Sequence, residues 1–311
     1  MDKRSKGTRK SHIVPKSYLR YFTNSNGRLC RYDNILSKWL DGDASPEAVC
    51  FEKDFYYMPH NQDDPLHWET TFANETDTLY GKPYRKLLEK LDTVPDKAIC
   101  LSRKDKELLL KLIIVQLSRT KKSKEFANNA DKEGPFSELH QFMIQNFGQY
   151  RRQRRRIEKA FDTARDLFNE QYMFDLALER FDDNNGVIKT ETRKFILNRN
   201  WNIFETEGNL IYYLTCDEPV ILYNPYTEMQ GIGNIGIAQP TTYIYYPLSS
   251  KYLLLVSPEQ QMLFLNGELS PICDGQKYLV NYNFVQRINQ LTLRNCSRFI
   301  YGRRTVNFPQ Q

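Results

Sequence analysis

The sequence of 311 residues lacks any long hydrophobic run. Its most apolar stretch, Leu108 to Leu117, is interrupted by Lys111 and Gln116 and falls short of the roughly 18 apolar residues of a transmembrane helix. The six cysteines lie at least 20 residues apart, without a C-x-x-C or C-x-x-H pair. These absences exclude a membrane-spanning helix, and they argue against a structural zinc site and a compact disulfide framework.

We expect no secretory signal, since the basic start MDKRSKGTRK is followed by no apolar segment and no small-residue cleavage site. Hydrophobic residues make up 40% of the chain and charged residues 26%, and the mean hydropathy is −0.65. We therefore expect a water-soluble globular protein of the cytoplasm, without a membrane partner. Nothing in the sequence predicts its oligomeric state.

Positive charge is concentrated in two segments, although the net charge is only +6. Residues 1–31 hold nine Lys or Arg against one acid, and residues 101–156 hold fourteen Lys or Arg against six acids. Residues 201–250 hold no Lys or Arg. Lys and Arg that neutralise phosphates release counterions, so these segments favour a nucleic-acid partner, with RNA ahead of DNA. The competing interpretation is a solvated basic surface. The candidate contact residues are Arg20, Lys121, Lys122, Arg151, Arg152, Arg154 and Arg155.

The densest cluster, Arg151 to Arg156, lies in a segment that we expect to be one continuous helix from about Phe136 to Arg180. On a helix these arginines spread over more than one face. Some can pair with Glu158, Asp162 or Asp166 three or four residues further on, and the others must meet water or phosphate.

The order of expected elements predicts an α+β fold. A flexible basic tail at 1–9 precedes a single domain at 10–311, with a helical part at about 66–181 and a strand-rich part at about 187–302. We expect a mainly helical N-terminal two-thirds packed on a C-terminal antiparallel or mixed β-sheet with a closing helix. A short hairpin is expected earlier, with Asn26-Gly27 between 19–22 and 29–32.

We find no familiar catalytic motif in the structural context that it requires. Gly231 to Gly236 matches G-x-G-x-x-G, but Pro240 follows too soon for the helix that a dinucleotide fold requires. There is no P-loop, no G-x-S-x-G and no H-E-x-x-H, and the four histidines are scattered.

A series of short motifs does carry a resemblance. In order they are KSHIVPKSYLRYF from Lys10, Asp54-Phe55-Tyr56, the glutamates Glu69 and Glu75, QLSRT from Gln116, CDEPV from Cys216, YPLS from Tyr246, and the closing segment Asn289 to Tyr301. Together they resemble a bacterial family catalogued as domain of unknown function 4238, over the length of the chain. The family usually has Asn after the Asp of the fifth motif, where this chain has Glu218. The family name brings no established activity, so the resemblance implies a fold and a site.

Two of these positions can be interpreted physically. Gln116 and Arg119 are three residues apart and therefore share one face of their helix, beside an apolar stripe. A guanidinium bordering a core needs a carboxylate, and Glu75, Glu69 or Asp217 could supply it. Such a contact is either a functional site or an internal salt bridge that locks the two halves of the protein together.

The leading hypothesis is a nucleic-acid-acting hydrolase, a ribonuclease of the toxin or phage-defence kind. His12 would be the general acid or base and Arg119 would stabilise charge on the phosphorus, with Glu75 and Asp217 orienting His12. The candidate catalytic residues are His12, Glu75, Gln116, Arg119 and Asp217, and the cofactor candidate is a divalent cation such as Mg²⁺ held by Glu69, Glu75 and Asp217. The alternatives are a non-catalytic module that binds nucleotides or nucleic acid, and a structural scaffold.

Overall fold

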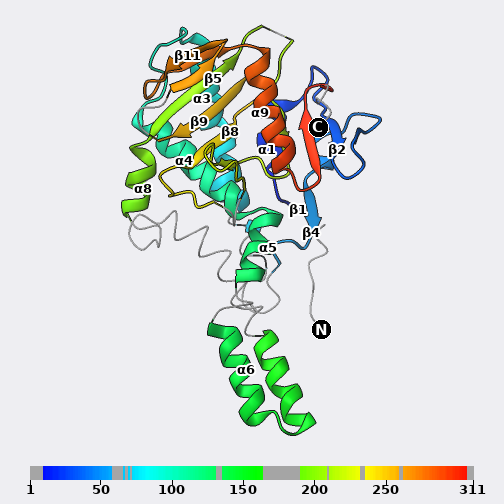
Figure 1. Cartoon of the computed structure of the whole chain (residues 1–311). Coiled ribbons are helices and arrows are strands. Elements are labelled where there is room, and N and C mark those ends of the chain that lie inside the picture. The colour runs from blue at the N-terminus through cyan, green and yellow to red at the C-terminus, as the bar shows by residue number, and fades with distance from the viewer. Residues whose placement is uncertain are drawn as a thin grey trace.

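The computed structural model describes residues 10–57, 66, 69–70, 72–130, 135–163, 190–208, 210–231, 235–258 and 262–306. The predicted basic tail at 1–9 lies outside these ranges. In the described part the strands form four sheets, of five, four, two and two strands. The fold is α+β overall (Figure 1).

Short strands dominate the beginning of the described chain. Strand β1 (Lys10–His12) pairs antiparallel with β4 (Phe51–Lys53). Between them lie α1 (Lys16–Leu19), the 3-10 turn η1 (Arg20–Phe22), the strands β2 (Cys30–Asp33) and β3 (Lys38–Trp39), and the 3-10 turn η2 (Pro46–Ala48).

The early strands are completed by strands from much later in the sequence. The four-stranded sheet has the order β3-β2-β13-β6, in which β6 is Thr215–Cys216 and β13 is Phe299–Gly302. Figure 1 shows the red β13 beside the blue β2. The two ends of the described chain therefore share one sheet, in which every neighbouring pair is antiparallel.

Helices follow β4. They are the π-helical turn η3 (Phe72–Thr76), the 3-10 turn η4 (Asp77–Tyr80), α3 (Lys82–Thr93), α4 (Arg103–Ser118) and α5 (Lys121–Ala130). A capping box starts α4, because Ser102 and Asp105 each accept a backbone N–H of the other. Residues 119–120 separate α4 from α5.

The largest sheet is mixed. Its order is β12-β5-β9-β8-β7, formed by Lys277–Val280, Asn200–Thr206, Tyr252–Ser257, Tyr243–Pro247 and Ile221–Tyr223. Only the β12 and β5 pair is parallel. Helix α8 (Thr190–Leu197) precedes β5, the hairpin of β10 (Met262–Leu265) and β11 (Glu268–Pro271) precedes β12, and α9 (Tyr282–Asn295) follows β12.

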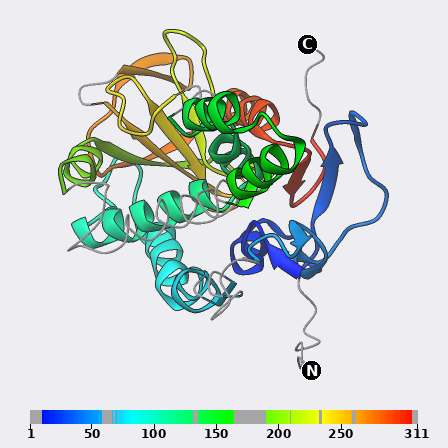
Figure 2. The same cartoon turned by 90° about the horizontal axis from the view of Figure 1, so that it is seen from below.

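Helices cover both faces of this sheet, because its strands alternate side chains between two hydrophobic clusters. Trp201, Ile203, Ile244 and Leu254 pack with residues of α3 and α4. Their neighbours Phe204, Tyr245, Leu253 and Leu255 pack with Val285 and Ile288 of α9. Figure 2 shows the teal α4 and the orange-red α9 on opposite sides of the sheet.

A helical hairpin forms a separate feature. Helix α6 (Pro135–Phe147) and a second helix at 151–163 lie side by side, with the rings of His140 and Phe161 4.8 Å apart. In Figure 1 the pair lies apart from the sheets. The predicted continuous helix from 136 is wrong here, because the helix ends before Gly148, where a Cβ atom would come within 2.4 Å of the Ile144 carbonyl oxygen. The predicted residues beyond 163 lie outside the described part.

The predicted layout is also wrong, since helices and strands are spread through the chain. Residues 10–57 hold four short strands, and one of them, β2, pairs with the C-terminal β13, so the strands do not form a single C-terminal sheet. These strands are only two to four residues long, too short to show a clear alternation of polar and apolar residues. The expected hairpin around Asn26-Gly27 is absent, because residues 19–22 are helical and β2 pairs with β3 instead.

Candidate functional site

Arg119 lies at the C-terminal end of α4 with only 2% of its side chain exposed. Its Nη1 donates to Oδ1 of Asp77 at 2.7 Å, its Nε to the Tyr56 hydroxyl at 3.1 Å, and its Nη2 to the His12 carbonyl at 2.6 Å. The guanidinium also lies 4.7 Å from the centre of the Phe72 ring. Burial alone would lower the pKa of Arg119, but its interactions with Tyr56 and Asp77 raise that pKa above the usual value.

Gln116 lies one turn earlier on the same helix and is 1% exposed. Its Nε2 donates to the Ile13 carbonyl at 3.2 Å, so Gln116 and Arg119 hold consecutive carbonyls next to β1. The shared helix face therefore clamps the N-terminal strand. The carboxylate that meets Arg119 is Asp77, which the sequence did not single out.

His12 and Glu69 both lie near Arg119. Burial lowers the pKa of His12, and the charges of Lys16 and Arg119 act in the same direction. Burial raises the pKa of Glu69, against a hydrogen bond with Ser11 and the charge of Arg119. Nε2 of His12 and Oε2 of Glu69 are buried and have no hydrogen-bond partner among the described residues.

The strand geometry separates these two groups. Glu69 contacts Ser11, while His12 follows Ser11 on β1 and packs its ring against Phe51, 5.9 Å between centroids. Successive side chains of a strand point to opposite faces. The imidazole ring of His12 and the carboxyl of Glu69 therefore lie on opposite faces of β1.

Asp217 organises the backbone before β13. Its Oδ1 accepts the N–H of Ser297 at 2.8 Å, and its Oδ2 accepts those of Arg298 at 2.8 Å and Phe299 at 3.0 Å. Burial raises the pKa of Asp217, although these three hydrogen bonds act in the opposite direction. Both carboxylate oxygens thus hold the chain where it enters the four-stranded sheet.

Glu218 is a buried acid at the position where the chain departs from the family pattern. Its Oε1 accepts the backbone N–H of Lys122 at 3.1 Å and the Ser297 hydroxyl at 3.2 Å. Burial raises the pKa of Glu218 to about 7, against hydrogen bonds from Thr120 and the Lys122 backbone. Glu218 therefore joins the first turn of α5 to the segment before β13.

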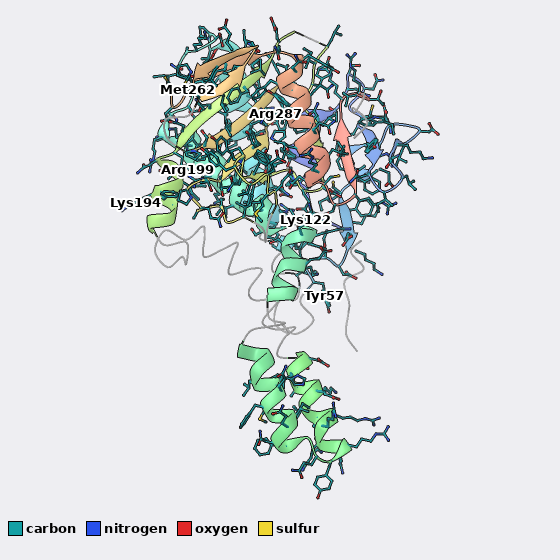
Figure 3. All side chains as sticks on the ribbon, viewed as in Figure 1. Tyr57, Lys122, Lys194, Arg199, Met262 and Arg287 are labelled. Carbon is teal, nitrogen blue, oxygen red and sulfur yellow. The ribbon has the colours of Figure 1, made fainter. Side chains whose placement is uncertain are left out.

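Several predicted nucleic-acid contacts are engaged within the protein. Lys121 pairs with Glu52, and the Lys122 Nζ donates to the Asn295 carbonyl at 2.5 Å. Figure 3 shows Lys122 at the end of α5 nearest the sheets. On the surface, Arg20 pairs with Glu47 at 2.9 Å and Arg154 with Glu158 at 3.0 Å.

The remaining candidates lie together on the helix at 151–163. Arg151, Arg152, Arg155, Arg156 and Lys159 line a surface hollow of about 530 Å³, and we call them the arginine face. All five are exposed, and no carboxylate pairs with them among the described residues. Their spacing of one, four, five and eight residues from Arg151 puts them on one side of the helix. Arg156 and Lys159 were absent from the predicted contacts, although this spacing in the sequence could have identified them.

The candidate metal ligands are not assembled in the described part of the chain. No group of three His, Cys, Asp or Glu side chains there is arranged to hold a metal ion. Glu69 and Asp217 have the partners given above, and the side chain of Glu75 lies outside the described residues. Within the same residues no helix is both long and apolar enough to cross a membrane.

Comparison with known proteins identifies the family. No curated protein and no solved structure matches the chain significantly. A family model described as "Protein of unknown function (DUF4238)" matches residues 10–305, which run from β1 to beyond β13. The matched range includes both the clamp around Arg119 and the arginine face. The chain therefore belongs to the DUF4238 family.

Proposed function

We propose that the protein binds nucleic acid through the arginine face. The observation that carries this proposal is the placement of five exposed cations, without acidic partners among the described residues, along one side of a helix. Arginine forks match the geometry of phosphate oxygens, and phosphate neutralisation gives affinity without sequence preference.

The length of the arginine face sets the size of the contact. Arg151 and Lys159 are eight residues apart, which is about 12 Å along a helix. One stacked strand carries three or four phosphates over that length, at about 3.4 Å each. For single-stranded nucleic acid this predicts a slope of log affinity against log salt between about −2 and −3, or a loss of about 15- to 65-fold between 50 and 200 mM salt.

The experiment is fluorescence anisotropy with a labelled 20-nucleotide RNA, and its DNA counterpart, from 50 to 200 mM KCl. Replacing Arg151, Arg152, Arg155 and Arg156 by Gln should weaken binding and reduce the size of the salt slope by about 2. Arg154→Gln is the matched control, because Arg154 lies on the same helix but pairs with Glu158. Equal affinity of the fourfold variant and the wild type would exclude the arginine face as the binding surface.

Hydrolysis of the bound strand is the second candidate. Cleavage of RNA at its 2′-hydroxyl needs one group to take the proton of the attacking oxygen and another to protonate the leaving oxygen. His12 and Glu69 have the buried, unpartnered atoms for such transfers. The geometry nevertheless favours binding over hydrolysis, because these groups lie on opposite faces of β1 and each of the three guanidinium nitrogens of Arg119 already donates a hydrogen bond within the protein.

Incubation with total RNA, with EDTA or with Mg²⁺, separates the two candidates. Fragments made by the wild type and not by His12→Ala would establish hydrolysis, and their loss in EDTA would add a metal. Intact RNA in every sample, together with salt-sensitive binding, would support a protein that binds nucleic acid without cleaving it.

A further inference from the structure

Two exposed aromatic rings flank the turn that leads into the arginine face. Phe147 is the last residue of α6 and is 54% exposed, while Tyr150 directly precedes Arg151 and is 70% exposed. Single exposed apolar residues are common on protein surfaces and need no explanation. Here, however, two rings occur within four residues and adjoin the five exposed cations of the arginine face.

The backbone of this turn has a defined geometry. The Gly148 N–H donates to the Ile144 carbonyl at 2.9 Å, and the Arg154 N–H donates to the Tyr150 carbonyl at 3.0 Å. Any side chain at 148 would collide with the Ile144 carbonyl oxygen, as its Cβ would lie 2.4 Å away. The closing turn of α6 and the opening turn of the next helix thus fix the backbone positions of both rings.

Exposed rings beside a row of cations suit one class of ligand. Proteins that bind single strands combine a basic track for the phosphates with aromatic side chains on which unpaired bases stack. A duplex offers the same phosphates, but its bases are already stacked on each other. A protein or lipid surface offers no planar bases at the spacing of the phosphates.

We propose that Phe147 and Tyr150 stack unpaired bases, so that the ligand of the arginine face is single-stranded nucleic acid. This inference rests on the proposed function, and it adds the strandedness of the ligand. The cations hold the backbone of the strand over residues 151–159, and the rings take bases at the end of the hairpin.

The test uses the full chain and three labelled probes of the same length: a 20-nucleotide oligouridylate, a 20-nucleotide ribose-phosphate strand without bases, and a 20-base-pair RNA duplex. The wild type should bind oligouridylate most tightly. Phe147→Ala combined with Tyr150→Ala should weaken that binding by about 5- to 150-fold for each ring that stacks a base. The same variant should bind the strand without bases as the wild type does, with an unchanged salt slope.

Two further variants make the result specific. Phe147→Trp combined with Tyr150→Trp should retain binding, because the indole rings also stack on bases. Tyr226→Ala is the control for loss of an exposed ring, since Tyr226 is 71% exposed in the loop between β7 and β8. It should not change the affinity for any probe.

The outcomes separate this inference from the proposed function. Unchanged oligouridylate binding by the double Ala variant, or duplex binding as tight as that of the single strand, would overturn base stacking and leave the arginine face as a phosphate site. If the wild type binds none of the three probes, the proposed function itself is overturned.

Discussion

Replacing Arg119 by Met tests whether the clamp around β1 is structural. The change removes hydrogen bonds to Tyr56, Asp77 and the His12 carbonyl while keeping much of the apolar stem. Breaking a buried ion pair costs about 3 to 5 kcal/mol, chiefly because the remaining charge loses its partner. Asp77 keeps 27% of its side chain exposed and regains some hydration, so we expect a loss near the lower end, about 3 kcal/mol.

The measurement is urea unfolding followed by tryptophan fluorescence, since Trp201 is fully buried in the core. Arg103→Met is the matched control. It lies at the start of the same helix, 54% exposed, and its contact with Glu107 spans 3.4 Å, so its removal should change stability by less than about 0.5 kcal/mol. A loss below about 1 kcal/mol for Arg119→Met would refute the structural role and free the guanidinium for the second, hydrolytic candidate.

Two further predictions concern Asp217 and Glu218, the two buried acids that directly follow β6. The raised pKa of Glu218, about 7, means that the folded state holds this proton longer than the unfolded chain, so stability should fall as pH rises from about 4.5 to about 7. Glu218→Gln should remove this pH dependence and be more stable than the wild type at pH 8 by about 3 kcal/mol, measured by urea unfolding. If the two proteins show the same dependence of stability on pH, the raised pKa of Glu218 is contradicted. Asp217→Asn replaces one oxygen that accepts backbone N–H groups by an amide donor. It should lower the free energy of unfolding by about 2 to 4 kcal/mol in the same assay. An unchanged stability would mean that the hydrogen bonds to Asp217 do not hold the segment before β13.

The sequence predicted several elements of the C-terminal part of the fold and missed others. The strands at 221–223, 243–247 and 252–257 and the closing helix α9 lie within the predicted strand-rich part at about 187–302, because they are apolar runs bounded by turn residues. Strand β5 was missed, although all seven of its residues are buried, because two asparagines and one glutamate interrupt its apolar pattern. Pairing between distant strands such as β2 and β13 has no signal in a single sequence.

The candidate site was predictable in part for a similar reason. Helical spacing correctly placed Gln116 and Arg119 on one face, since that depends only on local geometry. The partner of Arg119 could not be identified, because Asp77 lies 42 positions away and only the tertiary fold brings it near. The pairing of Arg154 with Glu158 was within reach, as it follows from residues four apart.

The sharing of one sheet by β2 and β13 has a consequence for how the protein is made. Asp33 of β2 and Arg298, next to β13, are 265 positions apart and form a salt bridge at 3.0 Å. A ribosome adds about 5 to 20 residues per second, so roughly 13 to 53 s pass between the synthesis of β2 and that of β13. During that time the nascent chain exposes an unpaired strand edge, where chaperones can bind and where a second nascent chain can pair wrongly. A chain released before residue 299 can never close this sheet.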